Sequence, residues 1–155
     1  MSFEKAGKYL EDKGYSDRII CFSVSSATVE LAAAALGCDP AWIAKSLTFK
    51  VNGRPVMIVC AGDVRIDNAR YKAAFSCKAA MLTPEEVETL IGHSIGGVCP
   101  FGINDGVEVY LDESLKRFDP VYPACGNAAS AVRLTPDELF QLSGAAGWVD
   151  VTKQR

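Results

Sequence analysis

One stretch constrains the fold more than any other, the sequence KSLTFKVNGRPVMIVCAGD at residues 45–63. Leu47 and Phe49 alternate with polar neighbours, which is the period of a strand with one buried face. Asn52 and Gly53 then supply the dipeptide that favours a tight turn between antiparallel strands. The apolar run RPVMIVCA follows and is typical of a buried returning strand. The chain is therefore expected to contain a sheet built on this hairpin.

Helix signals lie on both sides of the hairpin, and most have a clear start or stop. The alanine-rich segment 28–37 ends at a glycine, and Asp67 is placed to cap a helix that continues to residue 75. Two other segments begin with Thr-Pro, carry glutamate three residues after the threonine and end in glycine, which is the pattern of a capped helix. The expected helices are residues 2–13, 28–37, 67–75, 83–92 and 135–144, with a short one starting at Asp39.

Further strands are expected at residues 18–24, 107–112 and 130–135, which are rich in β-branched and apolar residues. Strands interspersed with helices, including at least one hairpin, indicate an α+β fold with a mixed, mostly antiparallel sheet flanked by helices. The sequence of 155 residues contains no linker, repeat or low-complexity segment. Residues 1–155 are therefore expected to form a single domain.

Composition and charge argue against several classes of protein. Net charge is −3, which argues against a protein that coats nucleic acid nonspecifically. The N-terminal residues mix acids and bases without an apolar run, so they do not resemble a signal peptide, and the uncharged run 19–29 is too short to span a bilayer. A cytoplasmic protein without a membrane partner is expected. Six scattered cysteines form no metal-ligand spacing, so neither a metal nor another cofactor is expected.

Basic residues are concentrated in the middle of the chain. Residues 45–78 carry seven basic side chains and two acidic ones, so the remainder of the chain is acidic. A solvated face would explain this stretch, and so would the positioning of one phosphate-bearing ligand. The basic residues are Lys45, Lys50, Arg54, Arg65, Arg70, Lys72 and Lys78.

A glycine-rich loop is the first candidate for chemistry. The segment IGHSIGGVCPFGIND, residues 91–105, holds four glycines and the only histidine of the chain. Glycine allows a loop to turn a corner or to let a ligand approach its main chain. Gly96 and Gly97 precede Pro100, whose φ is fixed, so successive N–H groups could point into a concavity that holds an oxyanion. A simple turn is the alternative.

Two other features are also candidates. Lys45 lies where a short helix meets the apolar strand, and such a lysine extends to water or donates to a phosphate, ribose or ester oxygen. Cys99 and His93 are six residues apart on the glycine-rich loop, which permits a nucleophilic thiol–imidazole pair, although the spacing suggests no third residue to orient it. Packing of Cys99 as a small apolar side chain is the alternative.

Several of these segments together resemble the YbaK/prolyl-tRNA synthetase-associated domain family. The resemblance runs from about residue 27 to about residue 142 and is carried by IAKSL (43–47), GDVRID (62–67) and GHSIGGVCPFG (92–102). Members of this family are editing deacylases, which hydrolyse the ester between a wrong amino acid and a tRNA. The resemblance therefore implies the α+β fold of that family and a carboxylic-ester hydrolase that acts on aminoacyl-tRNA.

The resemblance also assigns roles to residues. The family's hallmark lysine corresponds to Lys45, and its G-x-x-x-P loop corresponds to residues 96–100. Loop N–H groups would bind the aminoacyl carbonyl while Lys45 anchors the terminal adenosine or its phosphate, so that a water attacks the ester without a protein nucleophile. The catalytic residues implied are Lys45, Gly96, Gly97, Val98, Cys99 and Pro100, and the substrate-binding residues implied are Thr28, Ser46, Lys50, Arg70 and Gly126.

The expected function is a trans-acting hydrolase that removes a small mischarged amino acid, such as alanine or cysteine, from tRNA(Pro). Its partners would be the 3′-terminal adenosine and acceptor stem of the mischarged tRNA, together with a prolyl-tRNA synthetase. One methylene in an apolar pocket is worth only about 1–3 kcal/mol, so a larger correct amino acid would be rejected mainly by size. Two alternatives stay open: a binding module of the same fold that does not turn over, and a hydrolase that depends on Cys99 and His93.

Overall fold

The computed structural model describes residues 2–155. Within these residues, no helix has the length and apolar character needed to cross a membrane. The helices are α1 (Ser2–Asp12), α2 (Val29–Leu36), α3 (Asn68–Phe75), α4 (Pro84–Glu86) and α5 (Pro136–Leu142). The strands are β1 (Ile19–Cys21), β2 (Ile43–Val51), β3 (Arg54–Ala61), β4 (Val64–Ile66), β5 (Glu108–Asp112), β6 (Tyr122–Pro123), β7 (Ser130–Val132), β8 (Gly147–Val149) and β9 (Thr152–Gln154).

The predicted hairpin is the centre of the sheet. β2 and β3 pair antiparallel from Ala44 opposite Ala61 to Val51 opposite Arg54. Asn52 and Gly53 join them with φ of 51° and 79°, the left-handed conformation that a tight hairpin turn requires. These two strands lie within a sheet of five, in the order β6-β2-β3-β5-β8.

The remaining ladders are of both kinds. β6, β5 and β8 join the central sheet as parallel strands. Two small antiparallel sheets, β1-β7 and β4-β9, lie beside it. Over the described residues, more paired residues lie in antiparallel ladders than in parallel ones, because the β2-β3 hairpin is the longest ladder. The expected α+β fold with a mixed, mostly antiparallel sheet is confirmed.

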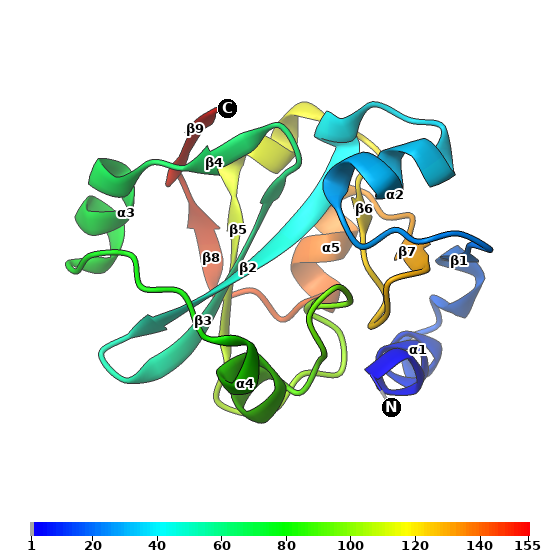
Figure 1. The fold of residues 1–155 in the computed structure, drawn as a ribbon, viewed down its shortest axis with the longest axis horizontal. Coiled ribbons are helices and arrows are strands. Elements are labelled where there is room, and N and C mark those ends of the chain that lie inside the picture. The colour runs from blue at the N-terminus through cyan, green and yellow to red at the C-terminus, as the bar shows by residue number, and fades with distance from the viewer. Residues whose placement is uncertain (1) are drawn as a thin grey trace.

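Helices cover both faces of this sheet. Side chains alternate along β3, so Met57 and Val59 join the main core while Val56 and Ile58 join a smaller one. The main core is completed by α1, α5 and the glycine-rich loop. On the other face α3 contributes the buried Tyr71. Figure 1 shows α3 on one side of the central strands and α1 and α5 on the other.

The helix ends follow the expected capping chemistry. Thr28 caps α2 by accepting from the amide of Leu31 at 3.1 Å. Thr83 and Thr135 each form a capping box with the glutamate three residues later. Asp39 caps a 3-10 turn at Pro40–Trp42, where a short helix was expected. Further 3-10 turns cover Ser16–Arg18 and Glu113–Arg117.

Three predicted elements differ in the structure. The helix expected at 83–92 is a single α-helical turn, α4, followed by the π-helical turn η3 (Val87–Ile91), in which the Gly92 amide donates to the Val87 carbonyl. The strand expected at 18–24 is limited to Ile19–Cys21, and beyond it the amides of Phe22 and Ser26 still donate to the carbonyls of Ala129 and Ala128 without forming a regular ladder. The strand expected at 130–135 ends at Val132, because Thr135 is already committed to capping α5.

Candidate active site

A cavity of about 270 Å³ opens beside β2. Its walls come from β2, the segment that leads into α2, and the loops around Met81 and Ile95. Most lining side chains are apolar, with a few polar groups among them, which is the usual form of a small-molecule site. The polar residues of the lining are Ser26, Thr28, Lys45, Ser46, Thr48, Tyr122 and Ser130.

Lys45 is the cation of this cavity. The register of β2 places it opposite Cys60 of β3, and its Nζ donates to the carbonyl of Val64 on β4. Partial burial lowers the pKa of Lys45 from the usual lysine value, although the carboxylates of Asp63 and Glu30 oppose that shift. An ammonium has three N–H donors, so two remain for a ligand.

Two serine hydroxyls at the cavity have no protein partner. Ser26 and Ser46 both line it, and the Oγ of each is buried without a hydrogen bond to any residue from 2 to 155. Leaving a buried polar group unpaired costs about 1–3 kcal/mol, so these hydroxyls mark positions where a ligand or water would bond. Thr28 differs from them, because its hydroxyl is used as the cap of α2.

The glycine-rich loop forms another wall of the cavity through Ile95, Gly96 and Val98. Gly96 has φ of 95°, a left-handed conformation that glycine adopts at little cost. Within the described part of the chain, the amides of Gly96 and Val98 donate to no protein acceptor, whereas the Gly97 amide bonds to Ser94 O at 3.1 Å. The loop therefore brings free backbone donors to the cavity wall, as an oxyanion site requires.

Close packing from behind fixes the position of this loop. A Cβ on Gly97 would lie 2.4 Å from backbone atoms of Gly126 and Asn127. A Cβ on Gly126 would in turn lie 2.4 Å from the carbonyl oxygen of Ser2 at the start of α1. Glycine is required at both positions, because any side chain would push the loop away from its support. Pro100 is also buried.

Cys99 and His93 meet behind the loop, but their geometry does not suit a nucleophilic pair. The Sγ of Cys99 lies 3.5 Å from Nε2 of His93, and that nitrogen also lies 2.7 Å from the carbonyl oxygen of Phe101. Because a carbonyl only accepts, Nε2 carries the proton and donates it, so it is not a base for the thiol. Cys99 is fully buried, and this burial raises the pKa of its thiol to about 12. Burial also lowers the pKa of His93.

The structure thus sorts the predicted site residues by position. Lys45, Ser46, Thr28, Gly96 and Val98 surround the cavity. Gly97, Cys99, Pro100 and Gly126 are not part of its lining; Gly97 packs against Gly126, and Cys99 and Pro100 are buried.

Two predicted binding residues, Lys50 and Arg70, lie outside the cavity lining. Lys50 forms an ion pair with Glu86. Arg70 bonds Asp150 at 3.1 Å and the carbonyl oxygen of Thr152 at 2.9 Å, so it joins α3 to the last strand. Neither side chain is available at the cavity wall. Within residues 2–155, no group of three or more histidine, cysteine or acidic residues could hold a metal ion.

Sequence reasoning missed several parts of the cavity. Ser26 was not distinguished from the neighbouring serines of FSVSSATVE, because only the folded chain shows which hydroxyl is buried and unpaired. Met81 and Ile95 line the cavity although their side chains are 61% and 60% exposed. Exposed apolar residues at a cavity mouth are typical of a binding site. The only sequence signal was that Met81 shortly precedes a helix start and that Ile95 belongs to the glycine-rich loop.

The sequence that forms this fold and cavity matches the model of a known family. The chain belongs to the aminoacyl-tRNA editing domain family, whose profile matches residues 24–142. The matched range includes Lys45 and the whole glycine-rich loop. The resemblance noted in the sequence is thereby confirmed.

Individual relatives include both a short protein and parts of long ones. The uncharacterized protein YwhH of Bacillus subtilis (strain 168) is 53% identical over 133 residues, which is 85% of this chain and 85% of YwhH. Proline–tRNA ligase of Geobacillus sp. (strain WCH70) is 31% identical over 120 residues, which is 75% of this chain but 21% of the ligase. The chain therefore spans about a fifth of that ligase.

Solved structures share the fold over nearly the whole chain. A candidate trans-editing enzyme for prolyl tRNA synthetase superposes with a TM-score of 0.88 at 32% identity, covering 98% of this chain and 97% of that one. The hypothetical protein APE2540 superposes with a TM-score of 0.86 at 27% identity, covering 96% of this chain and 99% of that one.

Proposed function

We propose that this protein is a trans-acting deacylase that hydrolyses the ester of a small mischarged amino acid on tRNA(Pro) in the cytoplasm. One observation carries the proposal: Lys45 and the free amides of Gly96 and Val98 belong to the walls of the same cavity. This cavity combines a cation for the tRNA end with backbone donors for an acyl oxygen. The similarity to a candidate trans-editing enzyme for prolyl tRNA synthetase supports this choice of tRNA.

The proposed reaction needs no protein nucleophile. The loop amides would hold the carbonyl oxygen of the ester, and Lys45 would donate to a ribose or phosphate oxygen of the terminal adenosine. Water then attacks the carbonyl carbon, and negative charge develops on the oxygen held by the loop. The carbon–oxygen bond to the ribose breaks, and the ribose hydroxyl leaves with a proton derived from the water. The buried, unpaired hydroxyls of Ser26 and Ser46 would position the acyl group or the water.

Cavity size supports a small acyl group. The volume of about 270 Å³ has to hold the amino acid and part of the ribose. The lining around the loop is mainly apolar, including Leu47, Val87 and Val98. Such a pocket favours alanine, cysteine or another small side chain and discriminates against larger ones by steric exclusion.

A substrate panel tests this function. The protein is incubated with tRNA(Pro) charged separately with alanine, cysteine, serine and proline, and multiple turnover is measured. We expect rapid hydrolysis of at least one small ester and little hydrolysis of the proline ester. Retention of the charged tRNA in a gel shift without turnover would support the binding module instead. If the protein neither hydrolysed the charged tRNA nor retained it in the gel, both functions would be contradicted.

A further inference from the structure

The structure divides the cations of the basic stretch into paired and unpaired groups. Lys50, Arg54 and Arg70 each form an ion pair with a glutamate or an aspartate. Their charge is therefore largely balanced within the protein. Arg65, Lys72 and Lys78 are exposed and form no ion pair with any residue from 2 to 155. Apart from Lys45 at the cavity, the unbalanced positive charge of this stretch therefore lies on β4, on α3 and just after α3.

A fourth unpaired cation faces Arg65 directly. In the antiparallel ribbon β4-β9, Arg65 pairs in register with Lys153, and both side chains are exposed. Like charges directly opposite each other on a ribbon are destabilising, so folding does not explain the pair. Asp67 is an acidic residue whose carboxylate interacts electrostatically with Lys153. Its pKa is lowered first by the hydrogen bond from the Arg70 amide and also by the charge of Lys153, but its carboxylate is used to cap α3.

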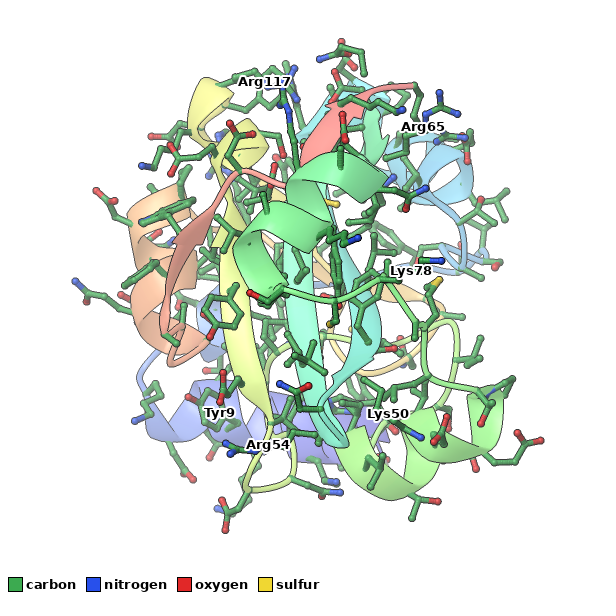
Figure 2. All side chains as sticks on the ribbon, turned by 90° about the vertical axis from the view of Figure 1, so that its left-hand side faces the viewer. Tyr9, Lys50, Arg54, Arg65, Lys78 and Arg117 are labelled. Atoms are coloured by element: carbon green, nitrogen blue, oxygen red, sulfur yellow. The ribbon has the colours of Figure 1, made fainter. Side chains whose placement is uncertain are left out.

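These four residues, Arg65, Lys72, Lys78 and Lys153, are here called the basic strip. Its position relative to the cavity is fixed at two points. Arg65 follows Val64, whose carbonyl accepts the hydrogen bond from Lys45. Lys78 is three residues before Met81, which lines the cavity mouth. Figure 2 shows Arg65 and Lys78 on the same side of α3, toward the side of the molecule that carries α2. Two members of the basic strip, Arg65 and Lys78, therefore lie next to segments that reach the cavity.

The chemistry of the basic strip fits one kind of partner. Surfaces that bind proteins place aromatic and apolar side chains at their centre, whereas surfaces that bind nucleic acid are polar and positively charged. The strip consists of long cations. None of the large exposed apolar side chains within residues 2–155 belongs to the strip; these are Val24, Leu31, Trp42, Met81 and Ile95. The rest of the molecule carries net negative charge, which would repel a polyanion from other faces.

We propose that the basic strip binds backbone phosphates of the tRNA acceptor stem while the 3′ end of the tRNA enters the cavity. This inference rests on the proposed function for the identity of the RNA. The strip includes Lys153, which lies beyond the residues that match the family profile, 24–142. It would position the ester for hydrolysis and would contribute to affinity through displaced counterions. It makes no contact with the reacting atoms.

Binding of uncharged RNA tests the basic strip independently of hydrolysis. An acceptor-stem hairpin of tRNA(Pro) carrying a fluorophore is titrated with the protein at several KCl concentrations. The variant Arg65→Gln/Lys153→Gln is compared with Lys8→Gln/Lys13→Gln, which removes the same charge from exposed positions of α1 and the residue that follows it. We expect the first variant to bind about tenfold more weakly at low salt and to lose about 1–2 from the slope of log K against log salt. The control should match the wild type.

The outcomes separate the two proposals. An equal loss of RNA affinity in both variants, or a loss in neither, would overturn the assignment of the basic strip to RNA. If the strip variant bound RNA normally but no longer bound poly-glutamate, the strip would instead be assigned to an acidic protein. Loss confined to the strip variant supports the inference even if no aminoacyl ester is hydrolysed. If the wild type hydrolyses a charged tRNA, the strip variant should raise KM with little change in kcat. It should hydrolyse the same ester on a CCA trinucleotide at the wild-type rate.

Discussion

In the proposed reaction, the chemistry of the site depends chiefly on the protonation of one residue, Lys45. Its ammonium is partly buried, which lowers its pKa from the usual lysine value, so it loses its proton at a lower pH than a free lysine does. The charged form is the one that donates to a ribose or phosphate oxygen. Activity is therefore expected to fall as pH rises through this lowered pKa.

A background-corrected pH–rate profile from about pH 6 to about pH 10 measures this effect on kcat/KM. We predict a descending limb that begins below the ordinary lysine pKa of about 10.4. Arginine stays charged over this range, so residual activity of Lys45→Arg should show no such limb. A wild-type profile that keeps rising to pH 10, or a descending limb that persists in Lys45→Arg, would contradict the role of the ammonium.

Cys99 provides a second test at this scale. Its thiol is fully buried, its pKa is raised to about 12, and the nearest imidazole nitrogen donates to a carbonyl. We predict that Cys99→Ala keeps kcat/KM within about threefold of the wild type while losing about 1–2 kcal/mol of unfolding free energy from lost packing. Loss of activity in a variant that remains folded by circular dichroism would restore the thiol nucleophile as the better hypothesis.

The residue scale also marks the limit of sequence reasoning. Lys45 and the glycine-rich loop could be expected at the site in advance, because Lys45 corresponds to the hallmark lysine of the family and the loop is marked by its glycines. Ser26 could not, because a buried unpaired hydroxyl is visible only after folding. Lys50 and Arg70 were expected at the substrate but have acidic partners that are distant in sequence, and no local pattern reveals such pairs.

Among the elements, the glycine-rich loop depends on how closely its backbone approaches its support. At Gly97 a methyl group would lie 2.4 Å from the backbone of residues 126 and 127, so the loop has to move. We predict that Gly97→Ala lowers the unfolding free energy by about 2–3 kcal/mol and reduces deacylation more than tenfold. Chemical denaturation and initial rates measure the two effects.

Gly7→Ala is the matched control for this substitution. Gly7 lies within α1, and a Cβ added there would meet no atom from outside the helix within 4 Å. Alanine in a helix is favoured over glycine by about 0.5–1 kcal/mol, so this variant should be slightly more stable and equally active. If Gly97→Ala behaved like Gly7→Ala, the close packing of the loop would not control the site.

Elements with local signals were predictable, and elements defined by distant partners were not. The hairpin, the α2 cap and both capping boxes follow from residues that are close in sequence. The π-helical turn after Glu86 was not expected. There Asn104, which is distant in sequence, donates to the carbonyls of Thr89 and Leu90 and so replaces part of the helical hydrogen bonding. A strand's parallel partner is equally distant, so the placement of β5, β6 and β8 could not be derived.

On the scale of the whole molecule, the N-terminal helix supports the site although the family profile does not include it. The carbonyl of Ser2 in α1 lies against Gly126, Gly126 supports Gly97, and Gly97 precedes Val98 at the cavity wall. Ala6 and Leu10 anchor α1 in the main core. The chain thus uses residues outside the matched range both to fix the loop and, through Lys153, to form the basic strip.

We propose that ester hydrolysis takes place in the cavity that contains Lys45. The most direct measurement is the single-turnover rate on whichever mischarged tRNA(Pro) the wild type hydrolyses, compared between Lys45→Ala and Lys8→Ala. Both variants remove one lysine charge, but Lys8 is exposed on α1. We predict a loss of about a hundredfold or more for Lys45→Ala and a wild-type rate for Lys8→Ala. A wild-type rate in Lys45→Ala would place the reaction outside this cavity and contradict the proposed role of Lys45.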